Sequence, residues 1–356
     1  MLNEKPTSAK EAILAAAREA GFELAGVAPV EDFPEHQRFE EWIAAGRAAE
    51  MQYLEARDDA GRLKRSSLRN TAPWARSVIV CAINYNTAQP YSTECNDPSR
   101  GWIARYAWSR EDYHDSVLEK LRRVETAIHT GAATSVETRC YVDTGPVVER
   151  IYAKYAGVGW IGKNTCVIHQ KHGSWLFLGV ILTSLELTPD IPAADRCGSC
   201  TRCIDACPTN AITAPYQLDA ARCISYLTIE KRGSISEQLR EGIGRHVFGC
   251  DICQDVCPWN RKAPVTSAAE FQPREGLVNP ALEWLAAMTE EEFRKTFRGS
   301  PIRRTKRQGL RRNTALAMGN SGETKFVEIL RVMSGDEDPV VAEAAIWAAE
   351  RLARKG

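Results

Sequence analysis

Several features that would place this protein in a familiar class are missing from its sequence. No stretch approaches the roughly 18 consecutive apolar residues that a membrane-spanning helix needs, and the run from Trp175 to Leu182 has only the length of a strand. The first residues mix acids with bases and contain no apolar core of signal-peptide length. We therefore expect a cytoplasmic protein without a membrane partner.

The chain also lacks an excess of either charge, since 46 Lys and Arg balance 46 Asp and Glu among 356 residues. Zero net charge argues against a chain coated in basic surface, but it leaves room for a local basic patch. The usual nucleotide-binding glycine motifs are absent as well. Gly157 to Gly162 comes near the dinucleotide pattern, but an expected strand follows it where a helix is required.

Cysteine, in contrast, is abundant, with 12 residues in a chain expected to work where structural disulfides are rare. Metal binding is the leading explanation. Cys197, Cys200, Cys203 and Cys207 are spaced C-x2-C-x2-C-x3-C, and Pro208 follows them. This run is typical of bacterial ferredoxins, in which the fourth cysteine serves a second 4Fe–4S cluster.

A second, incomplete cysteine run supplies the missing ligands. Cys250, Cys253 and Cys257 read C-x2-C-x3-C before another proline, and Cys223 can replace the cysteine that this run lacks. Structural zinc is the alternative, because zinc also binds C-x2-C pairs. The triple C-x2-C-x2-C and the two Cys-Pro steps favour clusters. The sequence therefore predicts two interleaved ligand sets: Cys197, Cys200, Cys203 and Cys257, and Cys223, Cys250, Cys253 and Cys207.

Four further cysteines stand alone: Cys81, Cys95, Cys140 and Cys166. Most of them lie in apolar runs, and isolated cysteines of this kind usually behave as small core residues. We expect none of them to bind a cluster.

The patterning divides the chain into three expected segments. Alternating helical and strand patterns predict an α/β or α+β domain over residues 1–190. Cysteine, proline and turn residues crowd residues 191–262, as in a ferredoxin-like domain with two 4Fe–4S clusters. Residues 263–356 are mostly helical, and 313–319 resembles 343–349. This weak repeat suggests an α-solenoid of the HEAT type.

Within the first segment, periodicity predicts particular elements. Residues 8–20 and about 112–129 should be helices, and 40–57 one or two more. Residues 76–86 form an apolar run that suits a buried strand. Residues 166–187 are expected to form two strands joined by a turn.

Five stretches of the sequence form a recognisable ordered pattern. They are 141–150 (YVDTGPVVER), 159–164 (GWIGKN), 173–179 (GSWLFLG), the cysteine runs and 231–234 (KRGS) ahead of the HEAT-like tail. Together they resemble epoxyqueuosine reductase over nearly the whole chain. The reductive dehalogenases are more distantly similar.

The resemblance implies an activity, cofactors and partners. In that family the epoxide of epoxyqueuosine, at the wobble position of a tRNA anticodon, is reduced to the alkene of queuosine with loss of water. This is the last step of queuosine biosynthesis. It uses base-off cobalamin, fed with electrons by two 4Fe–4S clusters that an external donor reduces. We accordingly expect a monomeric oxidoreductase with a cobalamin-binding catalytic domain, a two-cluster domain and a tRNA-binding helical segment.

Loss of the epoxide oxygen as water requires a proton donor, and the resemblance assigns this role to Asp143. Asp143 ends an expected strand beside Gly145 and Pro146, so an Asx-turn residue is the alternative. Asp112 and His114 begin the D-x-H-x-x-G motif of histidine-ligating cobalamin proteins, but position 117 is valine. No histidine ligand to cobalt is therefore expected from this motif.

Further candidates for corrin contact follow from family position or from closeness to the second set of cysteines. For each of them an ordinary turn, core or surface role stays open. The complete set of cofactor-binding candidates is Arg65, Tyr106, Asp143, Gly159, Trp160, Gly162, Lys163, Asn164, Ser225 and Asp251.

The densest charge run of the chain covers residues 298–312, with seven Lys or Arg and no acid. Such a stripe suits contacts with RNA phosphates, and a solvated helical face is the alternative. Lys231 and Arg232 would add contacts near the active site. The expected tRNA contacts are Lys231, Arg232, Arg303, Arg304, Lys306, Arg307, Arg311 and Arg312.

Two other functions are alternatives to a tRNA-acting reductase. A dehalogenase-like enzyme acting on a small organic substrate would not explain the basic stripe. An iron–sulfur electron carrier or scaffold would not need almost 200 residues ahead of its clusters.

Overall fold

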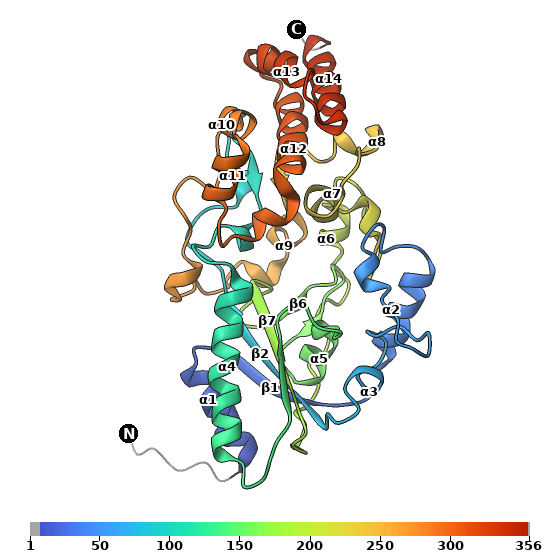
Figure 1. Cartoon of the computed structure of the whole chain (residues 1–356), viewed down its shortest axis with the longest axis vertical. Coiled ribbons are helices and arrows are strands. Elements are labelled where there is room, and N and C mark those ends of the chain that lie inside the picture. The colour runs from blue at the N-terminus through green and yellow to red at the C-terminus, as the bar shows by residue number, and fades with distance from the viewer. Residues whose placement is uncertain (1–7, 355–356) are drawn as a thin grey trace. The chain divides into compact units, whose positions relative to one another are not determined.

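The computed structural model describes residues 8–354 (Figure 1). The chain separates into two compact units. Unit 1 comprises residues up to 86, 113–201 and 258–268, and unit 2 comprises residues 87–112, 202–257 and those from 269 onward. The three-segment division at residues 190 and 262 is not tested by this separation and stays a prediction. None of the described helices is both long and apolar enough to cross a membrane.

Unit 1 contains one main sheet and the helices that cover it. Its elements are α1 (Ala9–Glu19), β1 (Leu24–Pro29), α2 (Pro34–Ala44), η1 (Gln52–Leu54), α3 (Leu68–Thr71), β2 (Ser77–Asn84), α4 (Tyr113–Gly131), β4 (Thr138–Tyr141), α5 (Glu149–Tyr155), β5 (Trp160–Ile161), β6 (Val167–Ile168), β7 (Leu176–Thr183) and η5 (Pro258–Asn260).

The main sheet has the strand order β1-β2-β7-β4, and every neighbouring pair is antiparallel. Helices α1 and α4 lie against one face and α5 against the other (Figure 1). Both faces are covered, which is why all eight residues of β2 are buried. Mixed helix and strand content is thus confirmed, and the antiparallel sheet makes unit 1 an α+β arrangement.

Two glycines let helices approach this sheet closely. A Cβ atom on Gly179 of β7 would lie 2.8 Å from the Leu121 Cδ1 of α4. A Cβ atom on Gly26 of β1 would lie 2.0 Å from the carbonyl oxygen of Ala156, at the end of α5. A larger residue at position 26 would push the end of α5 off the sheet, and one at position 179 would force the Leu121 side chain to move.

Most of the elements predicted for this segment are present. The helix at 8–20 is α1, with Ser8 as its N-cap, and the buried strand at 76–86 is β2. The prediction of one or two helices over 40–57 is confirmed only in part. Helix α2 begins earlier, at Pro34, which suits a first helical turn, and ends at Ala44, and the short η1 follows at Gln52–Leu54. The two strands of 166–187 exist, but β6 pairs with β5 while β7 joins the main sheet.

Unit 2 is built from short elements and a helical end. They are η2 (Ser92–Glu94), β3 (Trp102–Ile103), η3 (Arg105–Ala107), α6 (Arg202–Asp205), β8 (Ile212–Ala214), β9 (Gln217–Leu218), η4 (Ala220–Arg222), α7 (Ile224–Ile229), α8 (Glu237–Arg240), β10 (His246–Phe248), α9 (Ile252–Asp255), η6 (Ala269–Phe271), α10 (Leu282–Ala287), α11 (Glu290–Thr296), η7 (Pro301–Thr305), α12 (Lys306–Ser321), η8 (Thr324–Phe326), α13 (Val327–Met333) and α14 (Pro339–Ala353).

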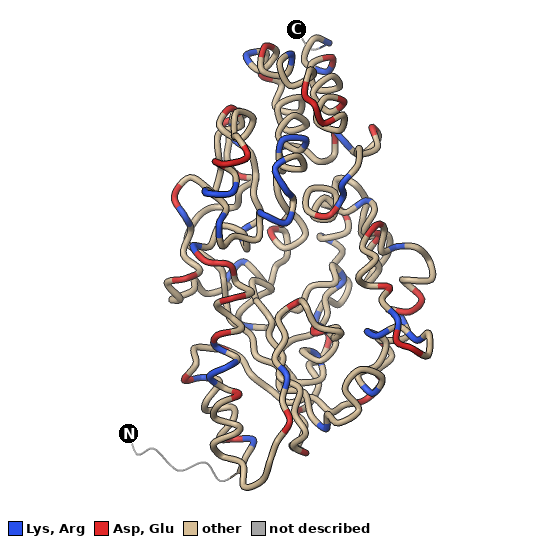
Figure 2. Tube along the Cα trace, in the orientation of Figure 1, with Lys and Arg blue, Asp and Glu red and all other residues tan. Residues whose placement is uncertain are grey.

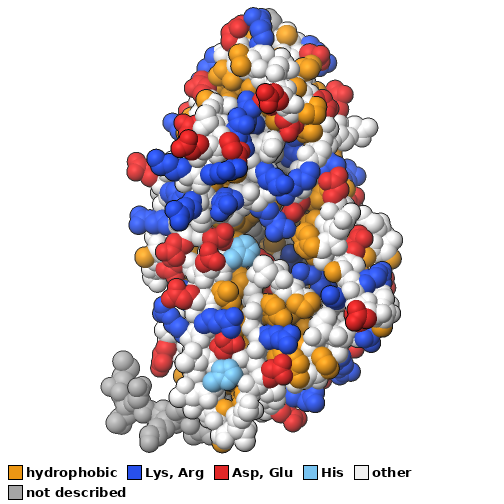
Figure 3. Space-filling view, viewed as in Figure 1, with side chains coloured by type: hydrophobic (Ala, Val, Ile, Leu, Met, Phe, Trp, Pro, Cys, Tyr) orange, Lys and Arg blue, Asp and Glu red, His pale blue; other side chains and the backbone are white. Residues whose placement is uncertain are grey.

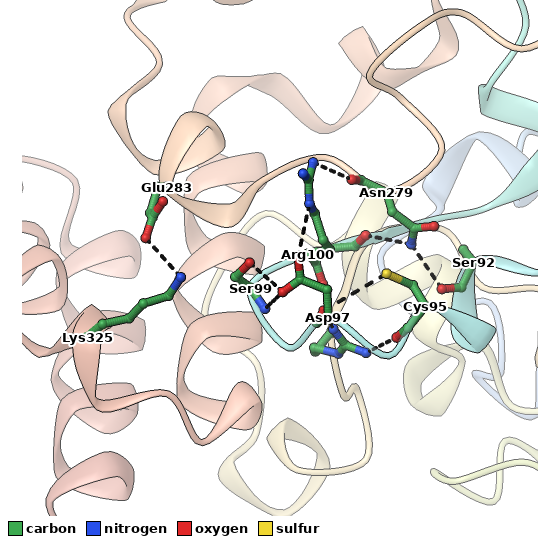
Figure 4. Close-up of polar contacts among 10 residues, drawn as sticks. Ser92, Cys95, Asp97, Ser99, Arg100, Asn279, Glu283 and Lys325 are labelled. Carbon is green, nitrogen blue, oxygen red and sulfur yellow. Dashed lines mark hydrogen bonds and ion pairs between the residues drawn. The ribbon is translucent and has the colours of Figure 1, made fainter.

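Residues 87–112 pack as part of unit 2 although they come from the N-terminal third of the chain. Strand β3 pairs in parallel with β10. The Asn279 side-chain amide donates to the carbonyl oxygens of Ser92, at 2.9 Å, and Gly101, at 3.1 Å (Figure 4). The Arg100 guanidinium donates a hydrogen bond to the Asn279 carbonyl oxygen at 3.3 Å. These bonds tie the inserted loop to the chain ahead of α10.

At the C-terminal end, α12 and α13 both pack against α14 (Figure 1). The two similar stretches, 313–319 and 343–349, lie on α12 and α14. A Cβ atom on Gly319 would lie 2.7 Å from the Ala348 Cα, so the small residues of the repeat allow this close contact. The helical character is confirmed, whereas the relation to HEAT repeats stays a prediction.

Candidate functional site

Asp143 lies in a tight turn directly after β4, with a left-handed φ of 58°, which is uncommon for residues other than glycine. Its carboxyl accepts a hydrogen bond from the Tyr113 hydroxyl. The Nε2 atom of His114 lies 3.9 Å from the same carboxyl oxygen. The Asp143 side chain is 54% exposed, so a bound molecule can reach it.

The Asx-turn alternative for Asp143 is not what the structure shows. Its recorded side-chain contacts within residues 8–354 are with Tyr113 and His114, and none is with a backbone N–H of the turn. The turn is closed instead by a backbone bond from Thr144 to Val142 at 2.7 Å. The carboxyl is therefore held by side chains of another element and directed away from its own backbone.

Tyr113 and His114 come from the first turn of α4, and sequence reasoning missed both as partners of Asp143. The Tyr113 ring stacks on Phe177 of β7 with centroids 4.2 Å apart, and on His114 at 4.0 Å. The sequence did contain a signal for Tyr113, because this residue lies four positions before Val117 and therefore on the buried face of the helix. A buried phenol usually requires a hydrogen-bond partner.

A second acid, Glu149, is the first residue of α5 and is 8% exposed. Burial, and secondly the negative charge of Asp143, raise the pKa of Glu149 to about 7. Arg65, a predicted corrin neighbour, donates to the Val147 carbonyl at 3.1 Å. Arg65 thereby holds the loop that runs from Asp143 to Glu149.

The predicted corrin loop at 159–164 forms β5 and the turn after it. Trp160 is 3% exposed and makes an edge-to-face contact with Trp259, with centroids 5.1 Å apart. Asn164 is buried, and its side-chain oxygen accepts from the Cys166 N–H at 3.2 Å. Gly159 and Gly162 lie against Ile168 of β6. These positions match the core and turn roles that the sequence left open.

Lys163, from the same loop, contacts the loop that carries two predicted cluster ligands. Its ammonium donates to the carbonyl oxygens of Gly198, at 2.6 Å, and Cys200, at 3.0 Å. The same loop is closed by a bond from the Cys200 N–H to the Cys197 carbonyl at 3.1 Å. Lys163 therefore supports the Cys197–Cys200 loop, a contact that spacing along the sequence could not reveal.

In unit 2, three of the four cysteines predicted for the second set lie close together. Burial, and then the neighbouring Cys223 and Cys207 thiols, raise the pKa of Cys250. The Cys250 N–H donates to the Ser225 Oγ at 3.1 Å. Cys253, the fourth member of this set, lies on α9, three residues after Cys250. The interleaved assignment of the eight ligands stays a prediction.

Two cysteines of the first set lie on or beside short helices of unit 2. Cys203 lies on α6 and Cys257 comes two residues after α9, and these two helices pack against each other. Within residues 8–354, no three His, Cys, Asp or Glu side chains are arranged to hold one metal ion. A 4Fe–4S cluster has separate irons, and each takes one thiolate, so its ligands do not need to meet at one point.

Three predicted corrin neighbours gather around residues 248–251 in unit 2. The Tyr106 ring lies 5.9 Å from that of Phe248, and Ser225 bonds to Cys250. Asp251 is 6% exposed and accepts from the Arg105 N–H at 2.5 Å, and burial raises the pKa of its carboxyl to about 6. Asp251 is thus engaged by the protein and anchors the 87–112 loop.

The basic side chains expected to bind tRNA lie around η7 and the start of α12 (Figures 2 and 3). Arg303, Arg304 and Lys306 are exposed, and Arg304 pairs with Glu230. Arg232 is also exposed and donates to the Thr305 carbonyl at 3.3 Å. Lys231 is half-buried. Most of this group can present positive charge to an RNA backbone.

Three of the predicted contacts are held inside unit 2. Arg311 pairs with Asp336, and Arg307 donates to the Met288 carbonyl at 2.8 Å. Arg312 is 1% exposed, and its guanidinium donates to the carbonyl oxygens of Lys231, at 2.8 Å, and Gly233, at 2.9 Å. The expectation that Arg312 contacts tRNA is corrected here, because a guanidinium enclosed by protein carbonyls cannot reach a phosphate.

Comparison with known proteins gives a consistent picture. A family model for a 4Fe-4S double cluster binding domain matches residues 196–260. A model described as epoxyqueuosine reductase QueG, DUF1730, matches residues 65–144. The epoxyqueuosine reductase of Synechocystis sp. is 44% identical over 293 residues, which cover 81% of this chain and 98% of the relative.

Two solved structures share the fold at 30% identity, each covering 96% of this chain and 90% of its own. One is epoxyqueuosine reductase with an epoxyqueuosine-modified tRNA-Tyr stem loop, with a TM-score of 0.87. The other is the enzyme from Bacillus subtilis with its aspartate-bearing catalytic loop swung out of the active site, with a TM-score of 0.86.

Proposed function

The chain belongs to the epoxyqueuosine reductase family, and on this basis we propose that it reduces epoxyqueuosine to queuosine at the wobble position of tRNA anticodons. It is an oxidoreductase that acts on tRNA. The observation that supports this proposal most directly is the match, over almost the whole chain, to a structure of epoxyqueuosine reductase with an epoxyqueuosine-modified tRNA stem loop. The dehalogenase-like and carrier alternatives are set aside in favour of this family.

Two 4Fe–4S clusters supply the electrons, in line with the double-cluster model over residues 196–260. The proposed ligands are Cys197, Cys200, Cys203 and Cys257 for one cluster, and Cys223, Cys250, Cys253 and Cys207 for the other. The closeness of Cys207, Cys223 and Cys250 supports the second set. An external donor would reduce the clusters.

Base-off cobalamin is the proposed second cofactor, and it would supply a cobalt centre able to pass two electrons to the epoxide. The donor chemistry of unit 1 fits such a ligand. The Trp160 indole N–H is buried without a partner in the described structure, and the Asp143 carboxyl is open. The His114 Nε2 lies 3.9 Å from the same carboxyl. Arg65, Tyr106, Gly159, Gly162, Lys163, Asn164, Ser225 and Asp251 stay candidate neighbours.

Asp143 is proposed to give the proton that the epoxide oxygen requires as its C–O bond breaks. The hydrogen bond from the Tyr113 hydroxyl holds the Asp143 carboxyl in place. The left-handed φ of Asp143 concentrates strain in this turn, which is common where a side chain must be presented for function. A relative whose catalytic aspartate loop can swing out supports placing this role on a turn.

The proposed tRNA surface consists of Lys231, Arg232, Arg303, Arg304 and Lys306. Arg307 and Arg311 are weaker candidates because protein groups already engage them. We further propose that residues 1–190 carry the catalytic domain, 191–262 the cluster domain and 263–356 a HEAT-like tRNA-binding segment. The enzyme would act as a monomer.

The function is tested by mass analysis of tRNA nucleosides. Epoxyqueuosine-containing tRNA is incubated anaerobically with reductant and with enzyme loaded with cobalamin and iron–sulfur clusters. The wild type should form queuosine. Fully loaded enzyme that forms none would disprove the proposal.

Asp143→Asn should lower the rate of queuosine formation by on the order of 100-fold to 10,000-fold, because it removes the acid but keeps the side-chain volume. Binding of the stem loop should be unchanged. Asp59→Asn, at an exposed position of unit 1, is the matched control. A near wild-type rate for Asp143→Asn would show that another group donates the proton.

A further inference from the structure

Glu149 is the most unusual titratable side chain of unit 1 outside the assigned residues. It is 8% exposed, and its Oε1 atom is buried without a hydrogen-bond partner in the described structure. A buried carboxyl oxygen without a partner costs free energy, so its presence calls for an explanation. It lies only six residues after Asp143, at the start of α5.

The charged groups that face Glu149 leave it without an ion pair. Arg65 and Arg150 are the nearby cations. The Arg65 guanidinium donates to the Val147 carbonyl at 3.1 Å, and that of Arg150 donates to the Thr165 carbonyl at 2.9 Å. Asp143 is the nearby anion, and Tyr113 and His114 in turn face Asp143. The strongest unneutralised neighbour of Glu149 is therefore the proposed proton donor.

The reaction demands more protons than one carboxyl holds. Reduction of an epoxide to an alkene breaks two C–O bonds and forms one C=C bond. Each turnover therefore takes up two electrons, from the clusters by way of the proposed cofactor, and two protons, and it releases one water molecule. Asp143 can give one proton and is then a carboxylate. The second proton must therefore come from solvent or from a neighbouring acid that reprotonates Asp143.

We propose that Glu149 is the reserve acid of this active site, which acts through Asp143 to provide the second of the two protons consumed in each turnover. Glu149 gives up its proton as Asp143 is reprotonated, and solvent reprotonates Glu149 after product release. Glu149 thus acts only through Asp143 and does not itself contact the substrate, so it is a positioning residue. This inference rests on the proposed function.

The electrostatics of the pair agree with such a role. Burial and the Asp143 charge raise the pKa of Glu149 to about 7, so a large share of this acid still holds its proton at neutral pH. An ordinary glutamate would have lost that proton.

The test compares Glu149→Gln with wild type in single turnovers of fully loaded, pre-reduced enzyme across pH 5.5 to about 8.5, the range around the Glu149 pKa. Gln keeps the shape but holds no proton. The variant should be slowed at least tenfold at the alkaline end, about the smallest effect of losing a proton-transfer group, and its activity should fall at lower pH than that of wild type. Glu149→Asp should restore part of the alkaline activity, and Glu119→Gln, an exposed glutamate of α4, should match wild type.

Infrared spectra supply a readout that does not depend on activity. Burial also raises the pKa of Asp251 to about 6 and that of Asp255 to about 8, so these acids contribute bands in every protein. The wild-type minus Glu149→Gln difference spectrum at neutral pH should contain the band of one further protonated carboxylic acid, and the wild-type minus Glu119→Gln difference spectrum should not. Unchanged pH profiles for Glu149→Gln would overturn the inference and leave Glu149 as a buried structural acid. Loaded wild type that forms no queuosine would instead overturn the proposed function, while the band would still report the protonation of Glu149.

Discussion

At the scale of single residues, burial separates side chains that look alike in the sequence. Arg303 and Arg312 belong to one basic run, yet Arg303 is exposed and Arg312 is enclosed by carbonyl oxygens. Asp143 and Glu149 belong to one motif, yet one carboxyl is open and the other is buried. These differences decide which groups can meet a ligand and which can only act through a neighbour.

Glu149 should make the stability of the protein depend on pH. Its pKa rises from 4.5 to about 7 on folding, so between these values the folded state binds more protons than the unfolded state. The free energy of unfolding therefore decreases as pH rises from 4.5 to above 7, by on the order of 3 kcal/mol. Anaerobic denaturant unfolding at pH 5 and pH 8 measures this loss.

In Glu149→Gln this part of the pH dependence should vanish, and the variant should be more stable than wild type at pH 8. Glu119→Gln should keep the wild-type dependence. An equal pH dependence in Glu149→Gln and wild type would show that Glu149 already ionises normally in the folded state.

Lys163 should be needed to retain the cluster bound by the Cys197–Cys200 loop. Lys163→Met removes the donor to the Gly198 and Cys200 carbonyl oxygens and loosens the loop. Iron content after anaerobic reconstitution should fall from about eight toward about four per chain. Lys171→Met, in an exposed turn, is the control, and a full iron content in Lys163→Met would contradict the prediction.

At the scale of elements, the start of α12 combines a structural and a surface role. Arg312 and Asn313 reach back to α7, to the 231–233 loop and to β10, and Asn313 donates to the carbonyl oxygens of Thr228, at 2.8 Å, and Val247, at 2.9 Å. Strand β10 leads directly to Cys250. The helix that carries Lys306 of the proposed tRNA surface therefore also supports the second cluster loop.

This double role predicts opposite phenotypes for two arginines. Arg312→Met should lower the free energy of unfolding by on the order of 3 kcal/mol, because it leaves buried carbonyls without donors. Arg303→Ala should change stability by less than about 0.5 kcal/mol but should weaken stem-loop binding and lower its salt dependence by about one ion. Denaturant unfolding measures the stability of the two variants, and fluorescence anisotropy at several salt concentrations measures their stem-loop binding. If Arg303→Ala binds the stem loop as wild type does, Arg303 is not part of the tRNA surface.

At the scale of the whole molecule, continuous chain segments and compact units do not coincide. Unit 2 takes residues from three separate stretches, and six of the eight predicted cluster cysteines share it with the helical end. Unit 1 likewise takes back residues 258–268, where the Pro264 carbonyl accepts from the Asn84 side chain at 2.8 Å. A function assigned to one stretch of sequence therefore depends on others.

A chain ended after residue 268 tests this dependence. Without α12, the carbonyl oxygens of Thr228 and Val247 lose their Asn313 donors, and β10 loses a packing partner. We expect the shortened chain to retain much less iron than the full chain after reconstitution, as measured by iron analysis and circular dichroism. Full cluster content would show that the cluster segment folds independently, as a purely sequential division implies.

The sequence by itself determined the features that depend on short spacing. Clusters were predictable because ligands three or four residues apart lie on one loop, and β2 and α4 were predictable because burial follows a local period. The ordered motifs likewise singled out Asp143. Tertiary structure alone decided that Tyr113 supports Asp143, that Lys163 supports the Cys197–Cys200 loop and that Arg312 is buried. These contacts join residues about 30 to 80 positions apart, and no local period encodes them, because they form only when separate elements pack.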